Sequence, residues 1–108
     1  YSPVRKMIQA GLPVALASDY NPGSSPSGNM KFIMSLGCIN YKMLPEEVIN
    51  ATTLNSAYAM GVEEEAGSIA VGKLANFYIT TPISGIEYLP YAYTADLIEA
   101  IFLKGEQY

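Results

Sequence analysis

The feature that most constrains the fold is a short apolar run between a helical pattern and a loop. Pro13–Ala17 reads PVALA and is almost wholly apolar. Such a run is typical of a strand covered on both faces, as in a parallel sheet flanked by helices. Before it, apolar residues recur at helical spacing within Ser2–Ala10, and Gly11 ends that pattern. A helix, a glycine and a buried strand in this order predict the repeating unit of an α/β barrel or a doubly wound sheet.

A loop and a helix are expected next. Ser18–Gly28 holds two prolines and two glycines among polar residues, which excludes regular structure. The helical period returns over Asn29–Met43. The apolar stripe of this helix is expected at Phe32, Ile33, Leu36, Ile39 and Met43.

Another helix is predicted from Pro45 to Gly61. Proline suits the first helical position, two glutamates follow it at the positive end of the helix, and glycine ends the pattern. Leu44 is a poor capping residue, so the start of this helix is less well defined. Its buried stripe is expected at Val48, Ala51, Leu54, Ala57 and Tyr58.

The chain changes character after Gly61 and becomes β-like. Two short β pieces are expected around Gly72, followed by an extended loop and a hairpin. The expected segments are Ser68–Thr80 for the β pieces, Thr81–Thr94 for the loop, Leu97–Leu103 for a strand, Lys104-Gly105 for a turn and Glu106–Tyr108 for a returning strand. We therefore expect residues 1–61 to form a helix-strand-helix part of a barrel, and residues 62–108 part of a small β domain.

Composition excludes several classes of function. The chain has 108 residues, of which 50% are hydrophobic and 15% charged, as in a globular protein. No apolar run approaches the length of a membrane helix, so no membrane partner is expected. The net charge is −4 and the six basic residues are scattered, so nothing resembles the basic stripe of a nucleic-acid surface.

The sequence contains no histidine. This absence excludes an internal Ser-His-Asp triad and a self-contained histidine-rich metal centre. Any such site must be completed from elsewhere. The one cysteine, Cys38, cannot form an internal disulfide and is expected to be a buried structural thiol, which fits a reducing cytoplasm.

The residue that points to chemistry is Asp19, which follows the expected strand and begins the loop. In parallel α/β barrels, catalytic groups project from the C-terminal ends of the strands. A carboxylate there can ligate a cation or move a proton, and Asn21, the Gly23 N–H and Ser24 can hold a polar substrate. Position alone leaves open a second interpretation, in which Asp19 caps a turn or the next helix.

The segment Val14–Cys38 resembles the strand-eight segment of imidazolonepropionases, members of the amidohydrolase superfamily. Their pattern of Asp, any residue and Asn-Pro-Gly-Ser-Ser is matched at Asp19–Ser25. Leu44–Gly61 resembles that family's helix bearing threonine and asparagine. Ala66–Ala75 resembles the superfamily's return into its small β domain. The resemblance therefore covers nearly the whole chain.

The resemblance implies both a fold and an activity. The fold would be α/β, the last strand and flanking helices of a metal-dependent (β/α)8 TIM barrel plus part of a small β-sandwich. The enzymes hydrolyse 4-imidazolone-5-propanoate to N-formimidoyl-L-glutamate with a zinc or iron ion. Asp19 matches their metal-binding aspartate, which also relays a proton. Asn21 and Gly23 match positions that hold the glutamate-like end of the product, and Ser24 matches a contact to the substrate.

Two departures from the family pattern matter. Asn76 stands where the superfamily usually has aspartate, which we expect to affect a turn. The histidine ligands of the metal are missing, and one carboxylate cannot hold zinc, because such sites need about three protein ligands. Together with the missing initiator methionine, this suggests a fragment that binds no metal and is inactive alone.

Two alternatives stay open. The chain could belong to an amidohydrolase acting on another cyclic amide. It could instead be a non-catalytic interaction module. In either case the unpaired edges of a barrel strand favour self-association, so we expect a homo-oligomer.

Overall fold

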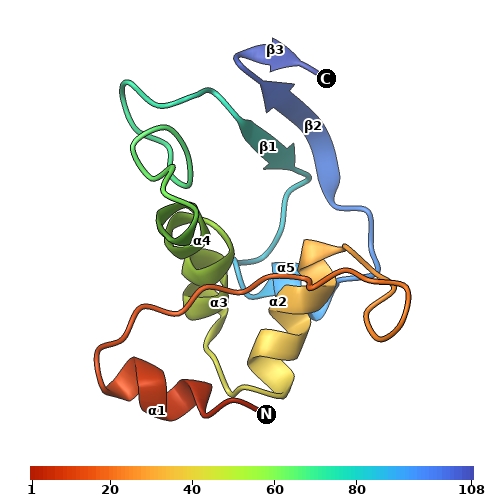
Figure 1. Ribbon diagram of the computed structural model, residues 1–108. Coiled ribbons are helices and arrows are strands. Elements are labelled where there is room, and N and C mark those ends of the chain that lie inside the picture. The colour runs from red at the N-terminus through yellow and green to blue at the C-terminus, as the bar shows by residue number, and fades with distance from the viewer.

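The structure, a computed structural model, describes residues 1–108. Figure 1 shows α1 at one end of the molecule, a group of helices in the middle and a small sheet at the other end. In chain order the elements are α1 (Val4–Gln9), α2 (Met30–Ile39), α3 (Pro45–Thr52), α4 (Leu54–Ala59), β1 (Phe77–Thr80), α5 (Tyr88–Tyr91), β2 (Ile98–Leu103) and β3 (Glu106–Gln107). None of the helices is long and apolar enough to cross a membrane.

Within this chain the apolar run Pro13–Ala17 is extended but forms no strand, contrary to the prediction. The run passes across the group of helices as a single segment (Figure 1). Val14 is buried and Leu16 half-buried, whereas the other three residues of the run are exposed, so only one face is covered. The physical reason is that a strand needs a paired neighbour. Here the Leu16 N–H donates instead to the carbonyl of Ala51, at 3.1 Å.

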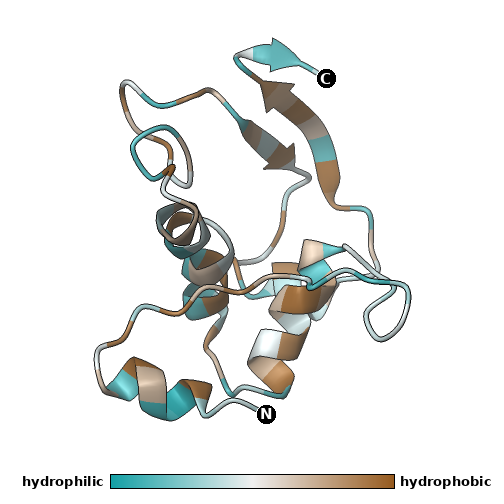
Figure 2. Cartoon of the chain, in the orientation of Figure 1, coloured by the Kyte–Doolittle hydropathy of each residue, from teal (hydrophilic) through white to brown (hydrophobic).

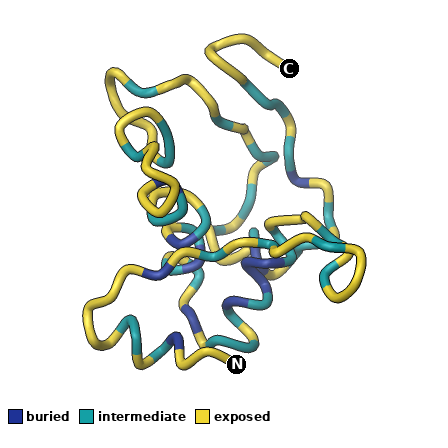
Figure 3. The backbone as a smooth tube through the Cα atoms, viewed as in Figure 1, coloured by how far each residue is buried: buried dark blue, intermediate teal, exposed yellow.

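The hydrophobic core lies among the helices. Figure 3 shows most of the buried segments gathered there, whereas the C-terminal hairpin is exposed or half-buried. Val48 of α3 has no exposed surface. The backbone of α2 approaches it closely, since a Cβ on Gly37 would lie 2.7 Å from Val48 Cγ1. The core cluster is Val4, Val14, Met34, Met43, Val48 and Ala51.

Helix α2 is shorter than the sequence predicts. The Asn29 side chain caps its start by accepting from the Lys31 N–H at 3.0 Å. The helix ends at Ile39, which is 62% exposed instead of lying on the buried stripe. The chain then turns through Lys42, at φ +59°, and this turn directs the buried Met43 back toward the core.

The single helix predicted from Pro45 to Gly61 is in fact two helices. Thr53, at φ −120° and ψ −88°, separates α3 from α4. The hydroxyls of Thr52 and Thr53 donate to carbonyls one turn earlier, to Val48 at 2.9 Å and to Ile49 at 2.6 Å. Such back-bonding bends helices.

The break in this helix changes which residues are buried. Ala57 is buried, but Leu54 and Tyr58 are exposed, although the sequence placed both on the buried stripe. Gly61 ends α4 at φ +74°, as predicted. At the start of α3 the side chain of Leu44 caps nothing; its N–H donates to the Glu47 carboxylate at 2.8 Å, which is one half of a capping box.

The C-terminal part forms a three-stranded antiparallel sheet in the order β1-β2-β3. Phe77 pairs with Phe102, and their rings stack with centroids 4.9 Å apart. Lys104 and Gly105 form the predicted turn, with φ values of 52° and 81°. The Asn76 side chain accepts from the Lys104 N–H at 2.8 Å, so this residue acts at a turn, as expected.

Two predictions for the C-terminal part were wrong. Of the two β pieces expected over Ser68–Thr80, only β1 forms, because β2 is the one partner strand available to this region. The expected loop Thr81–Thr94 contains the short helix α5. Pro90 of that helix is buried, and the ring of Tyr93 beyond it lies 5.5 Å from that of Phe32 on α2.

Candidate functional site

Asp19 lies where the extended segment ends and the loop begins. Its φ is +47°, in the left-handed region that asparagine and aspartate enter more readily than most residues. The residue is exposed, and its carboxylate takes part in no hydrogen bond or ion pair. The turn at Asp19 therefore presents a carboxylate with its acceptor oxygens accessible.

The three residues predicted to bind substrate lie together beside Asp19. The side-chain oxygen of Asn21 accepts from the Gly23 N–H at 3.0 Å and from the Ser24 N–H at 2.8 Å. It also lies 3.2 Å from Ser24 Oγ. This is an Asx turn, in which an asparagine side chain closes the loop on itself. The Gly23 N–H is thus directed into the loop.

Two further contacts close the loop at its base. Asn21 and Ser25 form an isolated antiparallel bridge, with N–H···O distances of 2.9 and 3.3 Å. Ser25 Oγ donates to the Ser18 carbonyl at 2.8 Å. The amide nitrogen of Asn21 donates to the Asp19 carbonyl at 2.7 Å. The backbone on both sides of the Asp19 Cα is therefore held by side chains from the loop.

The extended segment is attached to the start of α4 as well as to α3. Asn55 Nδ2 donates to the Val14 carbonyl at 2.9 Å. Ser56 Oγ lies 3.2 Å from the Leu16 carbonyl and 2.6 Å from the Ala51 carbonyl. Sequence reasoning missed both residues. No local signal marks them, because their partners lie about forty residues away in the chain.

No metal site is complete within this chain. There is no group of three or more His, Cys, Asp or Glu side chains close enough to hold an ion. The Cys38 thiol is half-buried beside the core, and its pKa is raised, first by burial and then by Glu46 and Glu47. A thiol with a raised pKa stays protonated and is a poor ligand. The sequence predicts a buried structural thiol, and Cys38 is instead half-buried.

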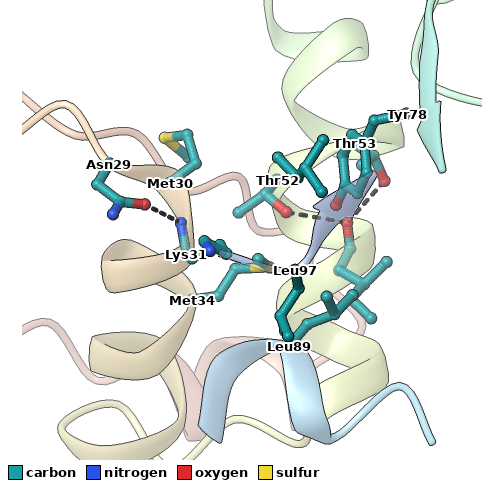
Figure 4. Close-up of a pocket in the computed structure, with 11 residues that line it drawn as sticks. Asn29, Met30, Lys31, Met34, Thr52, Thr53, Tyr78, Leu89 and Leu97 are labelled. Atoms are coloured by element: carbon teal, nitrogen blue, oxygen red, sulfur yellow. Dashed lines mark hydrogen bonds between the residues drawn. The ribbon is translucent and has the colours of Figure 1, made fainter. Parts of the chain in front are cut away.

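A separate cavity of about 370 Å³ lies between the helices and the sheet. Figure 4 shows Met34 from α2, Thr52 from α3 and Leu89 from α5 around it. Its one ionisable amine belongs to Lys31, which donates to the Ala95 carbonyl. None of the predicted site residues lines this cavity. It is mostly apolar and lacks convergent polar groups, so the Asp19 loop is the better candidate site.

The model of the amidohydrolase family matches residues 1–105. The chain belongs to the amidohydrolase family. Among curated relatives, this amidohydrolase chain is 57% identical to the imidazolonepropionase of Flavobacterium johnsoniae over 106 residues. It is 47% identical to that of Alkaliphilus oremlandii and 44% identical to that of Streptococcus pyogenes. The matches cover 98% of the chain but 25–26% of each relative, so the chain spans about a quarter of their length.

Solved structures agree on the fold. An amidohydrolase from Thermotoga maritima matches with a TM-score of 0.73 at 20% identity, over 96% of this chain and 24% of that one. The guanine deaminase of E. coli matches with a TM-score of 0.70 at 21% identity, over 97% of this chain and 29% of its own. The expected resemblance to imidazolonepropionases and the expected amidohydrolase fold are thereby confirmed, in an α/β chain.

Proposed function

We propose that this chain is part of an imidazolonepropionase, which opens the ring of 4-imidazolone-5-propanoate to give N-formimidoyl-L-glutamate. The observation that carries the proposal is the 57% identity to such an enzyme along 98% of the chain. Within that similarity, the loop that begins at Asp19 presents the polar groups that such a reaction needs. The enzyme would be a metal-dependent hydrolase of the cytoplasm that cleaves a cyclic C–N amide bond.

Asp19 is the residue we propose for metal binding and proton transfer. Metal dependence is general in the amidohydrolase family. Asp19 fits the place of one oxygen ligand of zinc or iron, and the remaining ligands would be histidines outside this chain, since it contains none. A bound metal would activate water for attack on the ring amide. The accessible carboxylate of Asp19 would also accept a proton from that water and pass it toward the leaving nitrogen.

The neighbouring loop is proposed to hold the substrate. Asn21 gives one of its two amide hydrogens to the Asp19 carbonyl and keeps the other for a ligand. The Ser24 hydroxyl is exposed and keeps an acceptor lone pair. The Gly23 N–H would reach a substrate carboxylate by exchanging its bond to Asn21 Oδ1 for one to the ligand. Asn21 and Gly23 would thus take the propanoate end, and Ser24 the ring.

The parent fold is proposed to be a (β/α)8 barrel with a small β-sandwich. Residues 1–61 would supply the last strand and its flanking helices, and residues 62–108 part of the sandwich. The open face of Pro13–Ala17 supports this, because neighbouring strands of a barrel would cover it. By itself the chain is proposed to be inactive and to self-associate through its uncovered segments. Light scattering at increasing concentration would test self-association, and a monomer throughout would count against it.

A chimera tests the proposed function. The matched quarter of the Flavobacterium johnsoniae imidazolonepropionase is replaced by this chain, and turnover of 4-imidazolone-5-propanoate is measured. We expect turnover, and we expect Asp19→Ala to abolish it and to weaken metal retention. Asp96→Ala, which removes another exposed aspartate outside the loop, is the matched control and should leave both unchanged. A folded chimera with metal but no turnover, or an active Asp19→Ala variant, would refute the proposal.

A further inference from the structure

We propose that Asn55 and Ser56, at the start of α4, are positioning residues that determine where Asp19 lies. They make no contact with Asp19. They act through the backbone of the extended segment that leads to it. The inference rests on the proposed function only for the role of Asp19, because the contacts themselves belong to the fold.

The contacts hold the segment at consecutive points along its backbone. The Val14 carbonyl accepts from Asn55, at 2.9 Å, and the Leu16 carbonyl lies 3.2 Å from Ser56 Oγ. The Leu16 N–H donates to Ala51, at 3.1 Å. The end of α3 and the start of α4 therefore fix the position of this run from Val14 to Leu16.

Helix α4 is itself firmly held, so it can act as an anchor. The break at Thr53 starts the helix anew, so Asn55 and Ser56 fall in its first turn. The turn after α4 packs against its far end, because the Val62 N–H donates to the Ala57 carbonyl at 2.9 Å. Gly67 lies so close that a Cβ there would come within 2.6 Å of Ala57 Cβ. These contacts hold the C-terminal half of α4 in place.

The position of Asp19 follows from two attachments, one on each side. On the upstream side, the Val14 carbonyl accepts from Asn55 of α4, and the Leu16 N–H donates to the Ala51 carbonyl of α3. On the downstream side, Ser25 holds the Ser18 carbonyl and Asn21 holds the Asp19 carbonyl. The loop alone would keep its internal shape but could move as a unit. A catalytic group must be held within about 0.5 Å of its productive place, so the upstream attachment is needed as well.

The test uses the full-length chimera, so that the histidine-bearing part is present. Three kinds of measurement are made on each folded variant: the amount of metal retained after gel filtration, the kinetics (kcat and KM) with the imidazolone substrate, and hydrogen exchange of the peptide containing Leu16. Asn55→Ala and Asn55→Asp both remove the donor to Val14. We expect kcat and metal affinity to fall about ten-fold, as for residues that orient a ligand, with faster exchange at Leu16. KM should change less.

Ser56 supplies a milder pair of variants in case Asn55 variants fold poorly. Ser56→Ala should lower kcat and metal affinity and speed exchange at Leu16, each by less than the Asn55 variants do. Ser56→Thr keeps the hydroxyl and should return these quantities to their values in the unsubstituted chimera. Asn50→Ala is the matched control, because Asn50 is exposed on α3 and its side chain makes no hydrogen bond. It should leave all three kinds of measurement unchanged.

The outcomes separate this inference from the proposed function. If Asn55→Ala lowers only the melting temperature, with metal retention and kcat unchanged, the residue is merely structural and the inference is overturned. Equal effects in Asn50→Ala would overturn it too. If the unsubstituted chimera retains metal but hydrolyses no substrate, the proposed function fails. Metal retention and exchange at Leu16 then still decide whether Asn55 positions Asp19.

Discussion

The helical part and the sheet of this chain differ in how their apolar residues are used. Figure 2 shows apolar residues on α2 and α3 and also along β1 and β2. In the helical part these residues form the core around Val48, which is fully buried. In the sheet no residue of any strand is buried, and Ile79 is 47% exposed. Similar hydrophobicity therefore gives a packed core in one region and an uncovered sheet in the other.

This difference shows that a local sequence pattern can form a strand without burying the apolar side chains of that strand. The hairpin of β2 and β3 forms because the turn at Lys104-Gly105 favours it locally. Its residues stay half-buried or exposed, because a cavity lies between the sheet and the helices. The helices have each other as partners, and the close approach at Gly37 closes their interface. We therefore expect the helical part to carry most of the stability of this chain.

The largest effect is expected from a pair of truncations, one in each region. Val48→Ala should lower the free energy of unfolding by about 2 kcal/mol, because it removes two buried methyl groups and leaves a cavity. Ile79→Ala removes more carbon but from an exposed site, and should lower it by about 0.5 kcal/mol or less. Urea unfolding followed by circular dichroism measures both. Equal losses would mean that the sheet is as well packed as the helices.

An intermediate effect is expected at the hairpin turn. Gly105 has φ +81°, and Gly105→Ala places a side chain in a conformation that disfavours it by about 1 kcal/mol. Hydrogen exchange at β3 should become faster, while the urea midpoint of the helical part should hardly move. Lys104→Gly, at φ +52°, relieves a left-handed residue and should slow exchange instead. If Gly105→Ala lowered the stability measured at the urea midpoint of the helical part by the same amount, about 1 kcal/mol, the two regions would unfold together.

The smallest effect is expected from the ion pair that joins α1 to α3. Arg5 binds the Glu47 carboxylate with two nitrogens and donates to the Lys42 carbonyl at 3.0 Å. The bond from Arg5, and then the bond from the Leu44 N–H, lower the pKa of Glu47 below its ordinary value. A carboxyl whose pKa is lower in the folded state stabilises the fold above its unfolded pKa of about 4.3, and this contribution is lost as pH falls through the folded pKa.

The test of this ion pair compares Glu47→Gln with the unsubstituted chain. Their difference in urea midpoint should be constant from neutral pH down to about pH 5 and should shrink below about pH 4.3. Glu64→Gln, at an exposed site after α4, is the control, because the Glu64 side chain makes no hydrogen bond or ion pair. If the difference in urea midpoint between Glu47→Gln and the unsubstituted chain grew on acidification, the ion pair would not be the source of the lowered pKa of Glu47. Because the pair is partly exposed, its effect should also weaken with added salt.

Features of the fold with a local cause were predictable from the sequence. Gly11 and Gly61 end helices because only a residue without Cβ enters the left-handed region freely. The turn at Lys104-Gly105 and the loop after Asp19 follow from the same local chemistry. The family resemblance also rested on adjacent residues, Asp19–Ser25. None of these features needs a partner that lies far away in the chain.

Features that depend on distant partners were not predictable. The run Pro13–Ala17 has the composition of a strand, but pairing decides whether it is one. Here its Val14 carbonyl accepts from the side chain of Asn55, a residue distant in the sequence. Whether Ile39 is buried depends on where the chain turns after α2.

The sequence by itself therefore determined which residues sit next to Asp19 in the loop, since turn chemistry acts over a few residues. Only the tertiary structure decided that α3 and α4 are separate helices and that Asn55 and Ser56 meet the segment before Asp19. The reason is physical. A hydrogen bond between distant residues depends on how the intervening helices pack, and no local pattern encodes that packing.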